Sequence, residues 1–329
     1  MSGGGNRVRI GILGAARIAS AALIKPAKGH AEVEVAAVAA RDVSRAQAFA
    51  AKHGIARVHE SYEALLADPG LDAIYNPLPI ALHGRWTRAA LTAGKHVLCE
   101  KPFTANATEA REIARLAAES DRVVMEAFHY RYHPCAARVE EIIASGELGK
   151  LVRVEGHWCF WMPKFSHNRY NYSLAGGALM DLGCYAVDMV RRFGGSTPEV
   201  VSAHAKLRGP EVDRTMTAEL RFAGGHTGRI HCSMWSTDPP RFTAKVVGDR
   251  GELRLHPLIP FQRFSVRSAD GKRVEQFPVR PTYAYQLDAF AAAVLRGEPV
   301  KTGPDEAVEN MTVIDAMYRA AGLAVREPA

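Results

Sequence analysis

The most informative stretch for the fold is Val8-Arg-Ile-Gly-Ile-Leu-Gly-Ala-Ala-Arg-Ile-Ala19, near the start of the 329-residue chain. Its apolar first half predicts a buried strand, and Gly14 predicts a tight turn directly after that strand. Aligned with the pattern G-x-G-x-x-G/A, it places Gly14, Ala16 and Ala19 at the three small positions. A strand, this turn and a helix in succession are typical of a dinucleotide-binding unit, in which the helix N-terminus faces the phosphates.

Further along, short apolar runs alternate with helix-like segments. Candidate strands lie at residues 34–39, 73–75, 96–99 and 123–125, and candidate helices at 44–52, 61–66 and 108–119. Strands joined by helical crossovers predict βαβ units and a parallel sheet. We therefore expect an α/β Rossmann parallel sheet in a dinucleotide-binding domain over residues 1–126.

Beyond residue 127 the pattern changes to longer runs of period two. Residues 215–222 and 227–235 alternate in this way around Gly224-Gly225, which predicts an antiparallel hairpin. Further turns are expected at 249–251 and 270–271, and helices at 134–145, 283–295 and 304–323. We therefore expect an α+β domain with a mostly antiparallel sheet over residues 127–329.

Composition narrows the classes of function. Hydrophobic residues at 47% and charged residues at 23% are ordinary for a globular protein and exclude a disordered one. The 42 Lys and Arg against 35 Asp and Glu leave a net charge of +7 without a basic run. This charge favours an anionic cofactor or substrate, and no motif indicates nucleic-acid binding.

The sequence also indicates the compartment. No apolar stretch approaches the ~18 residues needed to span a bilayer, and the N-terminus lacks the apolar region of a signal peptide. The five cysteines are widely spaced, without a C-x-x-C pair, which favours reduced thiols over disulfides or a zinc site. We therefore expect a cytoplasmic protein with no membrane partner. The cysteines are Cys99, Cys135, Cys159, Cys184 and Cys232.

The end of the second strand bears on the choice between NAD and NADP. NAD sites usually place an acid there, whereas NADP sites favour an arginine for the 2′-phosphate. Arg41 stands where a guanidinium can bind that phosphate, and Asp42 comes one residue late for the acid. The sequence therefore predicts NADP, with NAD left open, and Asp42 is expected to cap the next helix.

Two segments carry candidate catalytic groups. Lys101, in a Glu-Lys-Pro sequence, follows a predicted strand end and can polarise a hydroxyl or carbonyl group. Asp181, Tyr185 and Asp188 follow the Gly176-Gly177 turn at spacings of four and three, so they share one face of a helix. The plain alternatives are an exposed Lys–Glu pair and a helix with two surface acids.

A metal site is the remaining alternative. His129 and His133, with Glu126 nearby, would share a face if they lay on one helix. Pro134 follows directly and no HExxH pattern is present, so packed or pocket-lining histidines are favoured and no metal is expected.

Three stretches together resemble the glucose–fructose oxidoreductase / inositol dehydrogenase (Gfo/Idh/MocA) family. They are residues 11–19, 94–102 and 176–188, and the resemblance extends over nearly the whole chain. Residues 126–134 are most similar to the branch of dimeric dihydrodiol dehydrogenases and NADP-dependent D-xylose dehydrogenases. The resemblance implies a Rossmann domain, a second domain with a large open-faced sheet, and a homodimer formed through that sheet.

The resemblance also implies roles for individual residues. Lys101 would act at the reacting carbon, Tyr185 as the acid/base, and Asp181 in orienting the substrate or the catalytic pair; many relatives have His in place of Tyr185. The cofactor would contact Gly11, Gly14, Ala16, Arg17, Ile18, Arg41, Pro77, Leu78, His83, Glu100 and Lys101. The substrate would contact Tyr130, Arg131, Phe165, Arg169, Asp181 and Tyr185. Ile80 departs from the family, in which Asn is frequent at that position.

The implied activity is hydride transfer between the nicotinamide C4 of NADP and a secondary alcohol or carbonyl of a sugar, polyol or cyclic diol. A free tyrosine titrates near ~10, and a neighbouring ammonium lowers that pKa. Lys101 and Tyr185 would therefore have to converge for this chemistry. Two alternatives stay open, namely a glycosidase that cycles a tightly held NAD and a non-catalytic NADP-binding sensor.

Overall fold

The structure is a computed structural model that describes residues 7–164, 166–236, 241–256 and 262–329. The chain forms two compact units. The first contains the residues up to Thr104, Thr108–Tyr132 and Arg280–Ala307. The second contains Ala105–Ala107, His133–Val279 and Val308–Ala329.

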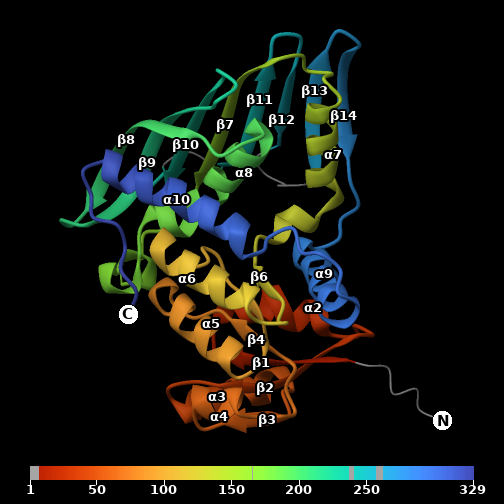
Figure 1. Ribbon diagram of the computed structural model, residues 1–329, viewed down its shortest axis with the longest axis vertical. Helices are drawn as coiled ribbons and strands as arrows, with labels where there is room; N and C mark the ends of the chain where they lie inside the picture. The colour runs from red at the N-terminus through yellow and green to blue at the C-terminus, as the bar shows by residue number, and fades with distance from the viewer. Residues whose placement is uncertain (1–6, 165, 237–240, 257–261) are drawn as a thin grey trace. The chain divides into compact units, whose positions relative to one another are not determined.

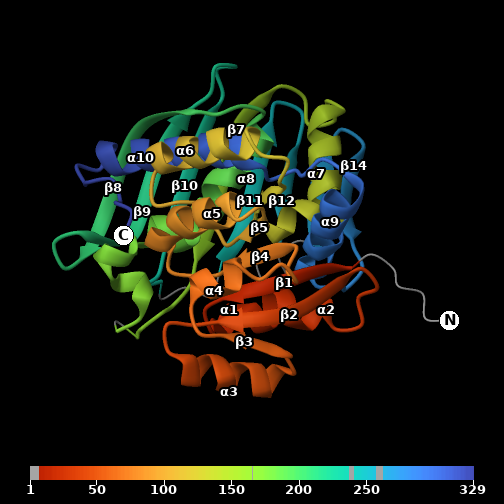
Figure 2. The ribbon, with the colours of Figure 1, turned by 60° about the horizontal axis from the view of Figure 1, so that its bottom comes forward.

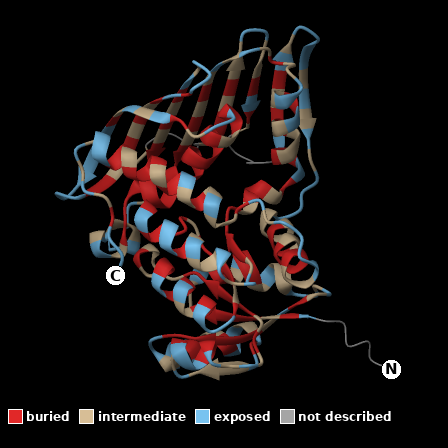
Figure 3. Ribbon diagram, viewed as in Figure 1, coloured by how far each residue is buried: buried red, intermediate tan, exposed pale blue. Residues whose placement is uncertain are grey.

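The first unit is built on a six-stranded parallel sheet with the strand order β3-β2-β1-β4-β5-β6 (Figure 1). This confirms the expected Rossmann arrangement. The strands are β1 (Val8–Leu13), β2 (Val33–Ala39), β3 (Arg57–His59), β4 (Ala73–Asn76), β5 (His96–Cys99) and β6 (Val124–Glu126). Because their side chains are mostly buried on both faces, the central strands are mostly apolar (Figure 3).

The helical segments of the first unit are α1 (Arg17–Ala19), the π-helical η1 (Ser20–Ile24), α2 (Lys25–Ala27), α3 (Val43–His53), α4 (Tyr62–Leu66), η2 (Ile80–Leu82), α5 (His83–Thr92), α6 (Ala107–Ala118), η3 (His129–Tyr132) and α9 (Thr282–Arg296). They lie between these strands or, in the case of η3 and α9, after the last of them. Ser61 caps α4 as its sequence position predicts, since its Oγ accepts a hydrogen bond from the Ala64 N–H at 3.0 Å. In the described ranges, no helix has both the length and the apolarity needed to cross a bilayer.

Helix α9 belongs to the first unit, although the sequence analysis placed residues 127–329 together. Its buried side chains Leu287, Phe290 and Ala291 join the core that contains Ile10 and Ile12 of β1. A distant segment thus completes the core of the Rossmann unit. Nothing in the local pattern of α9 indicates which sheet its apolar face covers.

The second unit contains an eight-stranded sheet with the order β14-β13-β12-β11-β7-β10-β9-β8. All neighbours are antiparallel except β7 and β10, and the hairpin expected around Gly224-Gly225 joins β9 to β10. The strands are β7 (Leu151–Cys159), β8 (Glu199–Arg208), β9 (Val212–Arg221), β10 (Thr227–Ser233), β11 (Arg241–Gly248), β12 (Glu252–Leu255), β13 (Arg263–Ser268) and β14 (Gly271–Gln276). The helices are α7 (Pro134–Ala144), η4 (Asn168–Tyr170), η5 (Tyr172–Leu174), the π-helical η6 (Leu179–Gly183), α8 (Cys184–Gly194) and α10 (Pro304–Ala320).

Helices cover one face of this sheet (Figures 1 and 2). Gly156 of β7 faces α8, since a Cβ there would lie 3.0 Å from the Ala186 carbonyl oxygen. The alternate residues Arg153, Glu155 and His157 point to the other face and are half-buried. Within the described chain no helix covers that face, so the sheet is open on one side, as expected.

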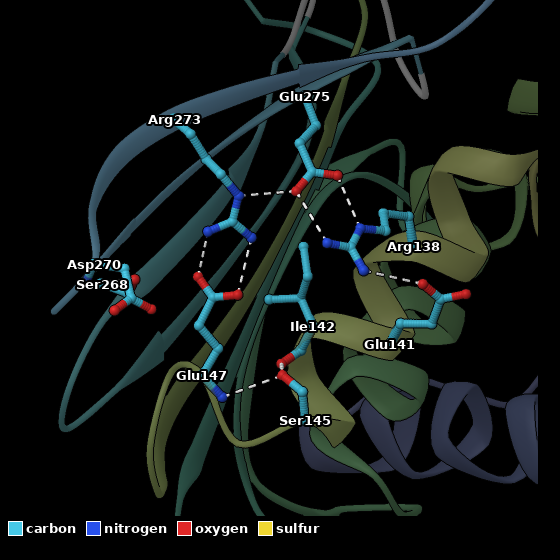
Figure 4. Close-up of polar contacts among 9 residues, drawn as sticks. All are labelled: Arg138, Glu141, Ile142, Ser145, Glu147, Ser268, Asp270, Arg273 and Glu275. Atoms are coloured by element: carbon cyan, nitrogen blue, oxygen red, sulfur yellow. Dashed lines mark hydrogen bonds and ion pairs between the residues drawn. The ribbon is translucent and has the colours of Figure 1, made fainter.

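An ion-pair network fastens the edge strand β14 to α7 (Figure 4). The Arg273 guanidinium binds Glu147 with two nitrogens and donates from Nε to Glu275 at 2.9 Å. Arg138 of α7 also donates to Glu275, at 2.9 Å, and to Glu141 at 3.1 Å. The hydrogen bonds from Arg138 and Arg273 hold the pKa of Glu275 below its ordinary value. These charges also discourage pairing of the sheet edge with another strand.

Candidate active site

The turn after β1 has the shape that a phosphate requires. Gly14 has a φ of 84°, and a Cβ there would lie 3.0 Å from Cδ2 of Leu78, so backbone and space both favour glycine. Ala16 precedes the first helical turn, and no side-chain hydrogen bond caps this turn in the described chain. Backbone N–H groups in this position bind pyrophosphate in many proteins. Arg17 and Ile18 in the same turn are exposed.

Gly11 has a different structural reason. A Cβ at this position would lie 2.7 Å from Cδ1 of Leu71 and 3.0 Å from Cδ2 of Leu65. The missing side chain therefore lets these two leucines pack directly against β1. Contact of Gly11 with a cofactor stays a prediction.

Two neighbouring residues after β2, Arg41 and Asp42, have different surroundings. Asp42 caps α3, since its Oδ1 accepts hydrogen bonds from the Arg45 N–H at 3.3 Å and the Ser44 hydroxyl at 2.6 Å. These hydrogen bonds lower the pKa of the Asp42 carboxyl, and the Ser44 contact has the largest effect. Arg41 is exposed beside it. Contact of Arg41 with a 2′-phosphate stays a prediction.

Tyr62 is a candidate that the sequence did not reveal. Its hydroxyl lies 3.6 Å from the Cβ position of Gly14, and its ring meets Trp86 edge-on with centroids 4.8 Å apart. Burial raises the pKa of Tyr62, while the charges of Arg41 and Arg45 oppose that rise. Tyr62 therefore lies beside both the phosphate turn and the basic end of β2. No motif marks it.

His83 joins two loops at the carboxyl edge of the parallel sheet. Its Nδ1 lies 2.8 Å from the Pro102 carbonyl oxygen and its Nε2 lies 2.7 Å from the Leu78 carbonyl oxygen. Burial lowers its pKa to about 4, and the charge of Lys101 acts in the same direction. This buried imidazole holds the Pro77-Leu78 loop next to the turn that carries Lys101. Its contact with a cofactor stays a prediction.

The turn after β5 carries Glu100 and Lys101. The Tyr75 hydroxyl donates to Glu100 Oε1 at 2.7 Å, and the Glu100 N–H donates to the Asn76 carbonyl oxygen at 3.0 Å. Glu100 is buried, whereas Lys101 is half-buried. The peptide bond between Lys101 and Pro102 is cis. Glu100 is thus bound on two sides, and this fixes the backbone from which Lys101 extends.

Two residues expected at the substrate are packed inside the first unit. Tyr130 and Arg131 are only 1% and 3% exposed, and Arg131 Nη2 donates to the Lys301 carbonyl oxygen at 3.2 Å. The neighbouring His129 lies against the Tyr283 ring with centroids 4.1 Å apart. Burial lowers the pKa of His129 to about 3, assisted by the charge of Lys101. Substrate contact by Tyr130 and Arg131 stays a prediction.

The metal alternative gains no support from these positions. His129 lies in η3, whereas His133 precedes α7 and its Nδ1 accepts a hydrogen bond from the Cys135 N–H at 3.1 Å. His129 thus lies within one helix and His133 at the start of the next, and the two histidines make different contacts. In the part of the chain that is described, no three His, Cys, Asp or Glu side chains gather into a metal site.

The two neutral histidines predict acid sensitivity. The ordinary pKa of histidine is ~6.5, so an unfolded chain takes up two protons as the pH falls from ~6.5 towards ~4, whereas buried His83 and His129 stay neutral. The free energy of unfolding is therefore highest above pH ~6.5 and falls as the pH drops through this range. We expect a loss of about 2 kcal/mol per histidine between pH 7 and 5. Urea unfolding at both pH values measures the loss.

A His83→Gln variant is the matched control for this pH dependence. The variant is less stable at every pH, but its stability should fall less between pH 7 and 5 because one titrating group is gone. Equal slopes for the variant and the wild-type chain would contradict the prediction.

In the second unit, Asp181 and Tyr185 follow the Gly176-Gly177 turn. The segment begins with the π-helical η6 rather than the regular helix expected from the spacing, and the Asp181 N–H donates to the Gly177 carbonyl oxygen at 3.0 Å. Asp181, Tyr185 and Asp188 are all at least 90% buried. The alternative of a helix with two surface acids is therefore wrong.

Asp181 and Tyr185 each have a defined neighbour. Arg169 Nε lies 2.5 Å from Asp181 Oδ2, and the Arg169 side chain is 38% exposed, so this ion pair reaches the surface of the unit. The Tyr185 ring stacks on Trp158 with centroids 4.7 Å apart and planes 10° apart. The structure thus brings Arg169 and Asp181 together. Phe165 lies outside the described residues.

A cavity of about 420 Å³ opens beside the Arg169 segment. Neither Asp181 nor Tyr185 lines it, so it is not the place where these two groups act. Residues that line it include His167, Asn168, Tyr172, Arg208 and Glu211.

The predicted site residues therefore form two groups, each within its own unit. Glu100, Lys101 and His83 lie together in the first unit, and Arg169, Asp181 and Tyr185 lie in the second. The convergence of Lys101 with Tyr185 stays a prediction.

Two family models match the chain, one in each half of the sequence. The family described as "Oxidoreductase family, NAD-binding Rossmann fold" matches residues 8–128. The family described as "GFO/IDH/MocA C-terminal domain" matches residues 136–254.

Individual proteins resemble the chain along most of its length. The D-xylose 1-dehydrogenase (NADP(+)) 2 of Haloferax volcanii is 39% identical over 94% of this chain and 96% of its own. The trans-1,2-dihydrobenzene-1,2-diol dehydrogenase of Bos taurus is 37% identical over 69% of this chain and 67% of its own. A solved 3-ketoreductase from Actinomadura kijaniata, in complex with NADP and TDP-benzene, has a TM-score of 0.87 and 28% identity, covering 96% of this chain and 98% of that chain.

Proposed function

Because the chain belongs to the Gfo/Idh/MocA oxidoreductase family, we propose that it is an NADP-dependent dehydrogenase of a sugar, polyol or cyclic diol. The reaction moves a hydride between nicotinamide C4 and a secondary alcohol or carbonyl carbon. One observation carries the proposal most directly. Lys101 follows β5 and the Gly14 turn follows β1, so both lie at the carboxyl edge of one parallel sheet, where ligands of this fold bind.

The first unit fits a dinucleotide at that edge. The turn at Gly14 and the uncapped N–H groups after Ala16 suit the pyrophosphate, and exposed Arg41 suits the 2′-phosphate. The Pro77-Leu78 loop, held by His83, borders the same turn. When bound, the cofactor supplies the hydride chemistry. NADP is favoured over NAD because Asp42 is already engaged as a helix cap.

In the proposed mechanism the protein residues move the proton and orient the substrate. Tyr185 takes the proton of the substrate hydroxyl during oxidation and returns it during reduction. The Lys101 ammonium favours the phenolate of Tyr185 and stabilises negative charge on the substrate oxygen. Asp181, fixed by Arg169, accepts a hydrogen bond from a second substrate hydroxyl.

The choice of cofactor predicts the effect of replacing Arg41. Arg41→Ala removes charge-assisted hydrogen bonds worth about 1.5–3 kcal/mol, so NADP affinity should fall by roughly 10–100-fold while NAD affinity is unchanged. Fluorescence titration with each cofactor measures both values. Lys52→Ala removes an exposed cation from α3 in the same unit and should change neither. An unchanged preference in Arg41→Ala would rule out this role.

The function itself is tested with a substrate panel. Purified protein is mixed with aldoses, ketosugars and diols and with NADP or NAD, and turnover is followed by nicotinamide absorbance. The proposal expects NADP-dependent turnover of at least one sugar or diol. A redox-cycling glycosidase would instead retain its cofactor and cleave a glycoside without net reduction, and a sensor would bind NADP without turnover.

The open sheet face and the cysteines support two further parts of the proposal. The helix-free face of the sheet carries half-buried charged side chains such as Arg153 and Glu155, which suits a homodimer formed through that face. The molecular mass in solution tests whether the homodimer forms. All five cysteines are buried and none of them forms a disulfide, which supports a reducing, cytoplasmic location.

A further inference from the structure

We propose that Arg326 is a positioning residue that fixes the Arg169–Asp181 pair by holding the Gly176-Gly177 turn to which both residues are hydrogen-bonded. The inference rests on the proposed function, since it assigns these two residues to the substrate. Arg326 belongs to what we call the Arg326 cluster, which consists of Arg326, Asp213, Tyr172 and Tyr318. The cluster lies entirely within the second unit.

The guanidinium of Arg326 is fully enclosed and uses its nitrogens on fixed partners. Nε donates to the Gly176 carbonyl oxygen at 2.9 Å, and Nη2 donates to Asp213 Oδ1 at 2.9 Å. Two more carbonyl oxygens, of Glu211 and Ala324, accept at 3.2 Å each. The side chains of Arg326 and Asp213 are both 0% exposed. The group therefore has no contact with solvent.

Aromatic rings enclose the same group. The guanidinium carbon of Arg326 lies 4.2 Å from the centroid of the Tyr318 ring and 4.8 Å from that of Tyr172. Tyr172 belongs to η5, which follows the Arg169 segment. The Arg326 guanidinium thus binds the Gly176-Gly177 turn through a hydrogen bond, and it binds the preceding segment through a cation–π contact with the face of the Tyr172 ring.

Asp213 holds the other side of the turn. Its Oδ2 accepts from the Leu179 N–H at 2.7 Å, at the first residue of η6, and its Oδ1 accepts from the Tyr318 hydroxyl at 3.0 Å. Gly177 has a φ of 145°, and a Cβ there would lie 2.1 Å from Asp213 Oδ1. Only glycine lets the turn lie this close to the carboxylate.

Both members of the candidate substrate pair are attached to this turn. The Gly177 N–H donates to the Arg169 carbonyl oxygen at 2.9 Å, and the Gly177 carbonyl oxygen accepts from the Asp181 N–H at 3.0 Å. The side chains of Arg169 and Asp181 then meet at 2.5 Å. A movement of the turn would therefore displace both residues together.

Stability alone is a poor reason for such a cluster. Removing two charges from water costs nearly as much as their attraction returns, so apolar residues of similar volume would stabilise the unit as well. Apolar residues cannot, however, make directional hydrogen bonds. The planar guanidinium has donors at fixed angles, and here they fix the Gly176 carbonyl relative to Asp213.

The test uses Arg326→Lys, which keeps the charge but loses the fixed set of donors. We expect kcat/KM for the sugar or diol to fall by about 10–100-fold, mostly through KM, with NADP affinity unchanged. Amide hydrogen exchange in residues 176–183 should become faster, and this readout needs no turnover. Tyr318→Phe, which keeps the ring and loses one hydrogen bond to Asp213, should change both readouts in the same direction by less.

Arg273→Lys is the matched control, since Arg273 belongs to the network of Figure 4 in the same unit and contacts none of the residues of the turn. It should lower stability without changing KM or exchange in residues 176–183. Wild-type KM and exchange in folded Arg326→Lys would overturn the inference; if that variant fails to fold, the same result in Tyr318→Phe would overturn it. Absence of wild-type turnover on the whole panel would instead overturn the proposed function.

Discussion

Replacing Lys101 with methionine is expected to lower kcat by about 10²–10³-fold, because one preorganised donor to a developing oxyanion contributes that much. Methionine has a similar length and no charge, so it removes the ammonium with little change in packing. NADP affinity should fall far less than kcat, since the phosphate turn and Arg41 are untouched and Lys101 is one of many expected cofactor contacts. Steady-state kinetics on the best substrate of the panel, with a separate NADP titration, measure both quantities.

The control for this variant is Lys52→Met, which removes an exposed ammonium from α3 of the same unit. It should leave kcat and NADP affinity unchanged. If Lys101→Met kept at least half of the wild-type kcat, Lys101 would have no role in the chemistry.

The architecture could be predicted because it depends on local periodicity. The apolar runs of β1, β2, β4 and β5 and the glycine turn at Gly14 are visible in the sequence, and the structure places them in one parallel sheet. The assignment of α9 failed for a physical reason. The sequence of an amphipathic helix shows that it has an apolar face but not which core that face joins, and Phe290 belongs to the same core as Ile10.

The site could be predicted where a residue stands in a motif and not where tertiary contacts define its role. Asp42 was expected as a cap because capping is local, and the structure confirms it. Tyr62 and Arg326 have no motif, since their partners lie far away along the chain. Asp213 and Arg326, for example, are 113 residues apart in sequence and form a buried pair.

Tyr185→Phe is expected to lower kcat by about 10²–10⁴-fold, the usual contribution of a positioned acid/base. The phenylalanine ring can keep the stacking on Trp158, so the variant should fold and bind NADP normally. Tyr285→Phe removes a hydroxyl from α9 in the first unit and should leave kcat unchanged. Activity of Tyr185→Phe close to that of Tyr285→Phe would exclude Tyr185 as the acid/base.

The pH profile separates a catalytic hydroxyl from a structural one. If the phenolate of Tyr185 is the base, kcat/KM for alcohol oxidation rises with pH to a plateau, and the residual activity of Tyr185→Phe lacks that ionisation. The residual activity of Lys101→Met should reach its plateau at higher pH, because loss of the ammonium raises the pKa of a neighbouring phenol. If the plateau moves to higher pH in Lys101→Met and the ionisation disappears in Tyr185→Phe, both residues act on the same proton. Two profiles that match the wild-type curve would separate Lys101 from Tyr185 and leave the mechanism without its base.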